Sequence, residues 1–141
     1  MSRFIKNFLL CGLTGWCLEI IFTALCSLHR RDLTLKGHTS IWMFPIYASA
    51  SFLSPLFRFL QHKSLLTRGL TYMSCIFAAE YCSGNILRKH HLCPWDYSNS
   101  TWNIKGLIRL DFAPLWFFTG LLFEKLILST KISSSQLPFS S

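Results

Sequence analysis

The sequence predicts an all-α membrane protein, a four-span transmembrane helical bundle with a long interfacial loop before the last helix. Of its 141 residues, 51% are apolar and only 14% are charged, whereas a soluble domain carries about 25% charge. Four apolar segments are separated by clusters of basic residues. Each segment can cross a hydrocarbon core of about 30 Å, which takes roughly 17 to 25 helical residues.

The first expected span, residues 8–28, follows two basic residues and carries Glu19 at its middle. Its ten Leu, Ile and Phe residues favour insertion by about 3 to 6 kcal/mol in sum, against about 3 kcal/mol for one central carboxylate. A cleaved signal peptide is the alternative interpretation. The segment is long for that role and offers no clear small-x-small cleavage site.

The remaining expected spans are 41–60, 69–87 and 112–128. Arg58 interrupts the second near its end, and polar residues dilute the third, so we expect the third to rely on neighbouring helices. The fourth is the shortest. The serine-rich end, 133–141, predicts a disordered tail after a single integral membrane domain over 1–132.

Charge leaves the orientation of the four spans open. With both termini on one side, each side of the membrane holds seven basic residues, so the positive-inside rule does not determine which side faces the cytoplasm. The net charge of +8 is what basic flanks beside anionic lipid headgroups produce, and we expect no nucleic-acid partner. The predicted location is a bacterial inner membrane or a eukaryotic endomembrane or plasma membrane.

Two glutamates, Glu19 and Glu80, lie within long apolar runs, where a carboxylate is costly unless paired, protonated or used. Both lie about 18 to 20 Å along helices that start from the same side. If they meet, one would hold a proton, which suits proton coupling or cation binding. The alternative is that both serve helix packing. Gly15 and Gly84 are each four residues from a glutamate, which predicts that both acids face the bundle interior.

Two further residues belong to this candidate site. Trp16 lies three residues before Glu19 and could donate its indole N–H to a carboxylate, or could simply pack. Glu124 is a weaker candidate, because an acid near a helix end that snorkels or pairs locally is favoured over a third member of a glutamate site.

The loop 88–111 is amphipathic and aromatic, so it should lie at the membrane interface or fold back on the bundle. Asp96, flanked by Trp95 and Tyr97 and near Arg109 in sequence, could bind a lipid headgroup or a polar substrate. The structural alternative is favoured: the aromatic side chains anchor the loop, and Asp96 pairs with an arginine or caps a turn.

Ligands with strong sequence signatures are not expected. The histidines and the cysteine of this loop do not have zinc-site spacing, so we predict no metal. No phosphate-binding loop is present, so this chain should not bind ATP, and we predict no cofactor. Membrane lipid is an expected partner. A homo-oligomer or a partner membrane subunit is also expected, because four short helices enclose little space.

The strongest pattern lies at the end of the third span and in the loop that follows it. It resembles the eukaryotic transmembrane protein 229 proteins and the bacterial CmpB group, catalogued as type IV ABC-transporter membrane proteins. The similarity covers about residues 8–128, and the segment at 42–48 has the eukaryotic-like form. The matching residues are Glu80, Tyr81, Gly84, Ile86, Leu87, Arg88, Cys93, Pro94, Trp95, Asp96, Tyr97 and Ser98, supported by Gly15, Trp16, Glu19, Trp42, Pro45, Ile46, Tyr47, Gly106, Ile108, Leu110, Pro114 and Trp116.

The resemblance implies a compact multi-pass membrane protein, and the transporter label is a catalogue name without an established activity. The leading hypothesis is a small permease-like subunit that uses Glu19 and Glu80. The first alternative is a membrane scaffold or assembly factor in which the acids serve packing. A lipid-modifying enzyme using Asp96 is less favoured, because no nucleophile–base pair can be assigned from the sequence.

Overall fold

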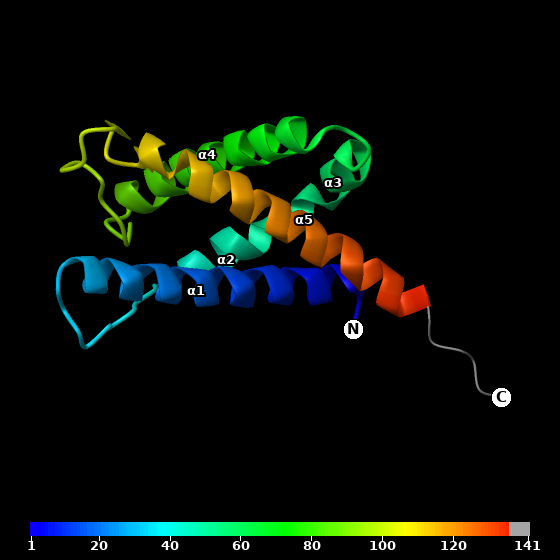
Figure 1. The fold of residues 1–141 in the computed structure, drawn as a ribbon, viewed down its shortest axis with the longest axis horizontal. Helices are drawn as coiled ribbons and strands as arrows, with labels where there is room; N and C mark the ends of the chain where they lie inside the picture. The colour runs from blue at the N-terminus through cyan, green and yellow to red at the C-terminus, as the bar shows by residue number, and fades with distance from the viewer. Residues whose placement is uncertain (136–141) are drawn as a thin grey trace. The chain divides into compact units, whose positions relative to one another are not determined.

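The computed structural model describes residues 1–135 and is mostly helical (Figure 1), which confirms the all-α class. It divides into two compact units, unit 1 (Met1–Leu53) and unit 2 (Ser54–Ser141), and each is described by itself. The single membrane domain over 1–132 stays a prediction. Of the predicted tail, residues 133–135 are helical, and residues 136–141 lie outside the described part of the chain.

Unit 1 is built on one long helix, α1 (Arg3–His29). The Ser2 hydroxyl caps its start by accepting a hydrogen bond from the Ile5 N–H at 3.3 Å. The helix ends where Arg31 adopts a left-handed backbone conformation, φ 63°. A loop then leads to two short elements, α2 (Met43–Ala48) and the 3₁₀ helix η1 (Ser49–Leu53).

Glycines allow α2 to pack closely on α1. A Cβ atom added at Gly12 would overlap the Phe44 ring, and one added at Gly15 would overlap the Tyr47 side chain. The Trp16 ring also meets Phe44 edge-on, with 4.9 Å between the ring centroids. The aromatic side chains of α2 therefore fill the space that the small residues of α1 leave.

The second expected span, 41–60, is not one continuous α-helix. It forms α2, then η1, then α3 (Ser54–Leu60), so this expectation was wrong in form. Pro55 lies at the second position of α3. Because proline has no N–H to donate and its ring clashes with the carbonyl four residues earlier, an α-helix cannot run through this point and restarts after a 3₁₀ segment.

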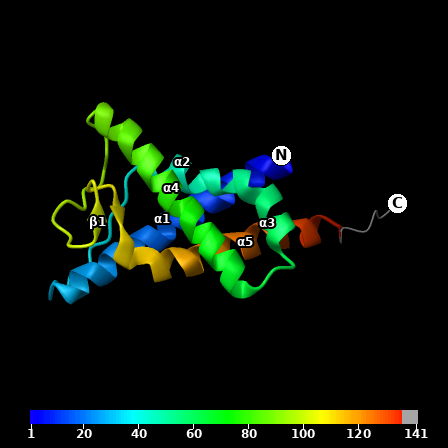
Figure 2. The same cartoon turned by 90° about the horizontal axis from the view of Figure 1, so that it is seen from above.

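Unit 2 continues from α3 with two long helices, α4 (Leu65–Lys89) and α5 (Ala113–Ser135), which pack together and are seen from a second direction in Figure 2. The Ser64 hydroxyl caps α4 by accepting a hydrogen bond from the Thr67 N–H at 3.2 Å. Tyr72 of α4 is 1% exposed; its ring meets Phe57 of α3 edge-on, and it lies against Gly120 of α5. These three helices share one core.

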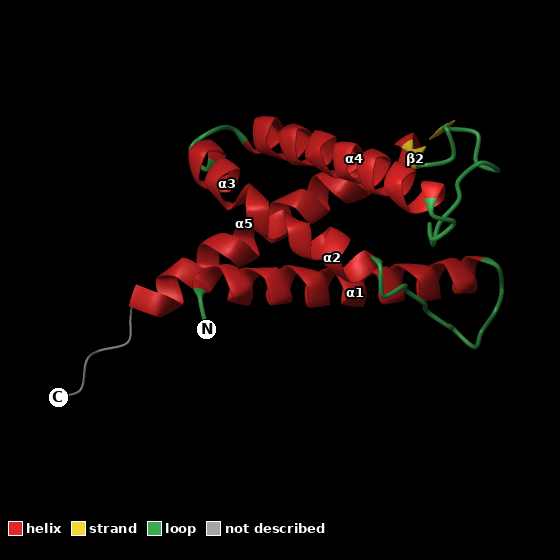
Figure 3. Ribbon diagram, turned by 180° about the vertical axis from the view of Figure 1, so that it is seen from behind, coloured by secondary structure: helices red, strands yellow, loops and turns green. Residues whose placement is uncertain are grey.

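The connection between α4 and α5 folds into a small hairpin, shown in yellow in Figure 3. Strands β1 (Asn103–Ile104) and β2 (Ile108–Arg109) pair antiparallel, and the 3₁₀ helix η2 (Leu110–Phe112) leads into α5. Gly106 has φ 69° in the turn, a conformation that glycine adopts without a steric cost.

Within the described residues, two segments are long and apolar enough to cross a membrane, namely α1 and the stretch Leu110–Thr130 that contains most of α5. The four-span bundle is therefore not confirmed. Helix α4 has the required length, but Ser74, Glu80 and Asn85 are among the polar residues that lower its apolar content. The second expected span does not form a helix long enough to cross a membrane, because it is broken into short elements.

Candidate functional site

Glu19 lies on α1 and is half-buried in unit 1. The Thr39 hydroxyl, from the loop before α2, donates a hydrogen bond of 2.8 Å to Glu19 Oε2. Tyr47, from α2, makes a second side-chain hydrogen bond to the same carboxylate. Three segments of unit 1 thus meet at Glu19, and the partners are hydroxyl groups.

The Tyr47 side chain can reach Glu19 because Gly15 lies one helical turn away from this acid. With no side chain at Gly15, the Tyr47 ring lies directly against the α1 backbone. Gly15 and Glu19 share a helix face because they are four residues apart. The glycine therefore positions a hydrogen-bonding partner of the glutamate as well as the packing of α2.

A strap, defined as residues Lys36–Ser40, runs along α1 and is held by a polar stripe on that helix. The Trp16 indole N–H donates to the Ser40 carbonyl at 3.0 Å, so its partner is the strap backbone and not a carboxylate. The Thr23 hydroxyl donates to the His38 carbonyl at 3.1 Å and accepts from the His38 N–H at 2.8 Å. The Ser27 hydroxyl donates to the Lys36 carbonyl at 3.0 Å.

The strap was not anticipated from the sequence, although one signal was present. The stripe residues are spaced by three, four and four positions, which places them on one face of a helix. They are Trp16, Glu19, Thr23 and Ser27. A polar stripe along an otherwise apolar helix indicates a polar segment packed against it.

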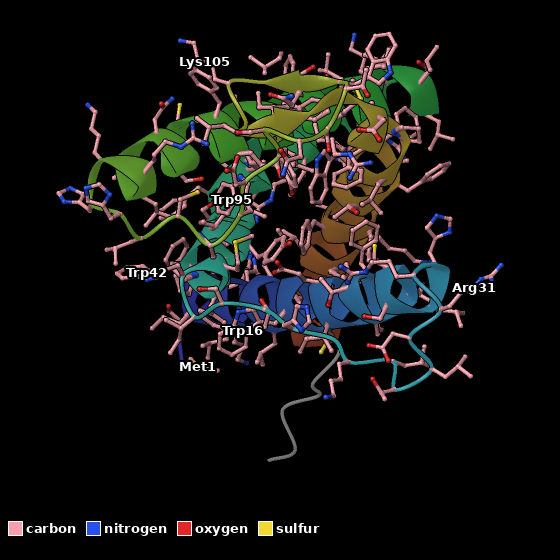
Figure 4. The ribbon with its side chains drawn as sticks, turned by 90° about the vertical axis from the view of Figure 1, so that its left-hand side faces the viewer. Met1, Trp16, Arg31, Trp42, Trp95 and Lys105 are labelled. Atoms are coloured by element: carbon pink, nitrogen blue, oxygen red, sulfur yellow. The ribbon has the colours of Figure 1, made fainter. Side chains whose placement is uncertain are left out.

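Glu80 lies on α4 and is 7% exposed. One turn further, Gly84 lies against Leu107 and Trp95 of the loop between α4 and α5. The Trp95 indole N–H donates to the Leu107 carbonyl at 3.1 Å. The loop is thus packed on the end of α4, and Trp95 is labelled in Figure 4. The meeting of Glu80 with Glu19 joins residues of different units and stays a prediction.

Glu124 on α5 is 6% exposed and forms an ion pair with Arg68 of α4, with 3.3 Å between Arg68 Nε and Glu124 Oε2. Tyr72 makes a side-chain hydrogen bond to the same carboxylate. Its sequence neighbour Lys125 is exposed. The partner of Glu124 therefore comes from another helix, which sequence distance alone does not reveal.

Asp96 is exposed and stabilises a turn. Its Oδ1 atom accepts a hydrogen bond from the Ser98 N–H at 3.0 Å and another from the Ser98 hydroxyl, and Arg88 Nη2 lies 3.9 Å away. The Ser98 hydrogen bonds, followed by the Arg88 charge, hold the pKa of Asp96 below its ordinary value.

The other predicted loop residues have separate neighbours. Arg109 pairs with Asp111 at 2.8 Å and lies over the Phe112 ring, and the Tyr97 ring meets Phe112 edge-on. The Lys105 ammonium donates to the Tyr81 hydroxyl at 3.0 Å, and this bond raises the pKa of Lys105. Among the described residues, no group of three His, Cys, Asp or Glu side chains has the arrangement of a metal site.

Comparison with known families gives a match that covers nearly the whole chain. The model of the CmpB family, described as "Putative ABC-transporter type IV", matches residues 6–138. No solved structure matches the chain. The similarity to the transmembrane protein 229 proteins stays a prediction. With 6–138 matched, this chain belongs to the CmpB family.

Proposed function

We propose that this chain is a small, multi-pass, permease-like membrane subunit in which Glu19 and Glu80 take up and release a proton or a hard cation. The observation that carries the proposal is the environment of Glu19, a half-buried carboxylate whose partners are the hydroxyls of Thr39 and Tyr47. The family description supports a transport role. No phosphate-binding loop is present in the sequence, so the energy for active transport would come from a partner subunit or an ion gradient.

Hydroxyl partners suit a carboxylate that changes its protonation state. A hydroxyl donates a hydrogen bond to an ionised carboxylate and accepts one from a protonated carboxylic acid. Glu19 therefore keeps its partners in both states. Carboxylate and hydroxyl oxygens are also the ligands that hard cations prefer, so the same three side chains suit either a proton or a small cation.

The membrane arrangement that fits this role has four crossings. α1 and the Leu110–Thr130 segment are each long and apolar enough to cross the membrane without a partner helix. We propose that α4 crosses together with α5, because the ion pair of Arg68 with Glu124 removes two uncompensated charges from the cost of insertion. The segment from α2 to α3 would complete the bundle, with its non-helical turns covered by protein. A second copy or a partner subunit, with surrounding lipid, would enclose the pathway.

The test is flux through purified protein in liposomes that contain a trapped pH-sensitive dye. With an imposed pH gradient and a potassium diffusion potential, the unmodified chain should acidify or alkalinise the lumen faster than empty vesicles. Glu19→Gln and Glu80→Gln should abolish this flux while the protein stays folded. Lys125→Gln, at an exposed position on α5, is the matched control and should leave the flux unchanged.

A scaffold or assembly role is the second candidate, and the buried contact between Arg68 and Glu124 favours it. A pair of charges held between two helices fixes their register without needing any solute. Under this alternative, Glu19→Gln and Glu80→Gln would lower the thermal stability of the protein and would not change the permeability of the vesicles. The same preparations therefore separate the two candidates.

A further inference from the structure

We infer that the strap (Lys36–Ser40) is a re-entrant segment that connects Glu19 to water at the Arg30 end of α1. This inference rests on the proposed function, because it names the side from which the Glu19 site is loaded. The evidence for it is the set of hydrogen bonds between the strap and α1, in addition to the environment of Glu19. Figure 4 labels Trp16, at one end of the stretch of α1 concerned, and Arg31, which lies just beyond the end of α1.

The strap runs antiparallel to α1 and descends from the end of the helix towards its middle. Lys36 is bonded at Ser27, and Ser40 is bonded eleven residues earlier in the helix, at Trp16. At a rise of about 1.5 Å per residue, this stretch of α1 is about 16 Å long. If α1 crosses a hydrocarbon core of about 30 Å, the strap reaches roughly the middle of it, where Thr39 contacts Glu19.

Non-helical backbone at this depth is tolerated only where it is covered by protein or lines water. Side-chain donors of α1 lie within hydrogen-bonding distance of the carbonyls of Lys36, His38 and Ser40, which are alternate residues of the strap. In an extended segment the intervening residues present their carbonyls on the opposite side. That side needs water or protein, and His38 is exposed, so we assign it to a water-filled path.

Two further features support a water-filled path along the strap. Gly37 lies so close to α1 that an added Cβ would overlap the Ile20 carbonyl oxygen, so only glycine allows the strap to lie against the helix here.

The second feature is the charged surface where the path would open. The exposed residues there are Arg30, Arg31, Asp32 and Lys36. Asp32 forms a turn there by accepting hydrogen bonds from the Thr34 N–H and hydroxyl, and the hydroxyl bond in particular keeps the pKa of Asp32 low.

The first experiment maps which side reaches the strap. The six native cysteines are replaced by alanine or serine, and single cysteines are placed at His38, at Asp32 as a marker of the Arg30 end, and at Lys6 as a marker of the opposite end of α1. Each variant is placed in liposomes and treated with a membrane-impermeant maleimide from one side and then the other. His38→Cys should react from the same side as Asp32→Cys. Protection from both sides, or reaction from the Lys6→Cys side, would overturn the inference.

The second experiment connects the strap to Glu19. A water-soluble carbodiimide with a fluorescent amine is added from the Asp32 side, and labelling of Glu19 is measured by mass spectrometry. The label should appear on Glu19 and should be lost once a bulky maleimide occupies His38→Cys, while the same adduct at Asp32→Cys leaves it unchanged. Unchanged labelling with the adduct at position 38 would contradict the path. Neither experiment measures flux, so failure of the proposed function would not be mistaken for failure of the path.

Discussion

The two units bury their acidic side chains in different ways. In unit 1 the partners of Glu19 include the hydroxyls of Thr39 and Tyr47. In unit 2 the Tyr72 hydroxyl also bonds Glu124, but the carboxylate is paired in addition with the guanidinium of Arg68. A hydroxyl can donate or accept a hydrogen bond, whereas a guanidinium only donates and carries a positive charge. From this difference we propose that Glu19 is the acid that changes its protonation state and that Glu124 serves the contact between α4 and α5.

The largest expected effect comes from breaking the fixed pair of unit 2. Arg68→Leu leaves the buried charge of Glu124 without its partner and should lower the free energy of unfolding by about 3 kcal/mol. Glu124→Leu should cost less, because the Arg68 side chain that remains is 23% exposed. The double variant should lose less than Arg68→Leu, because no uncompensated charge remains. Unfolding in mixed detergent micelles, followed by circular dichroism, measures all three. Equal losses that simply add in the double variant would show that the pair is not coupled.

The next effect concerns how Tyr47 is positioned in unit 1. Gly15→Leu places side-chain atoms where the Tyr47 ring lies and should destabilise the chain by about 1 to 3 kcal/mol through overpacking. Cys17→Leu adds bulk at an exposed position on the same helix and is the matched control, with little expected change. Equal stability of the two variants in the same unfolding measurement would mean that α2 does not pack on α1 in this way.

A smaller effect is expected from the hydroxyl that bonds Glu19. Thr39→Val keeps the shape of the side chain but removes its hydrogen-bond donor, and should cost about 1 kcal/mol of stability. Thr39→Ser keeps the hydroxyl and should retain most of the stability, so the pair separates the hydrogen bond from packing. If Thr39→Val proves as stable as the original chain, the hydroxyl does not stabilise the carboxylate.

The smallest expected effect concerns the pH dependence of the loop in unit 2. Because the folded loop lowers the pKa of Asp96, the loop is stabilised at pH values above the ordinary aspartate pKa of about 3.9. This contribution is lost as the pH falls through the lower folded pKa. Hydrogen exchange of residues 93–109 should therefore speed up at acidic pH. In Asp96→Asn this acid-dependent step should be absent; if it is unchanged there, another group controls it.

Much of the fold could be predicted from the sequence, because long apolar runs with basic flanks are strong signals. The expected spans at 8–28, 69–87 and 112–128 lie within α1, α4 and the η2–α5 segment. The second span was predicted as continuous because its composition is apolar. The effect of Pro55 on the carbonyl four residues earlier is local stereochemistry, which composition does not reveal.

The candidate site was predictable in part. The position of Gly15 one turn from Glu19 could be read from the spacing, but the partners of Glu19 come from a loop and from a separate helix. The contact of Arg68 with Glu124 depends on how α4 and α5 align, which the 55 intervening positions along the chain do not specify. Pairing across helices is set by packing geometry, so it appears only in the folded structure.

The central claim is that Glu19, which has hydroxyl partners, changes its protonation state, whereas Glu124, which is paired with Arg68, serves helix packing. Infrared difference spectroscopy of the reconstituted protein between neutral and acidic buffer measures this directly, through the carbonyl stretch of a protonated carboxylic acid. The part of the band that Glu19 contributes should be lost in Glu19→Gln, which leaves the part from Glu80, and it should be kept in Glu124→Gln. A band that is unchanged in Glu19→Gln, or that disappears in Glu124→Gln, would contradict the account.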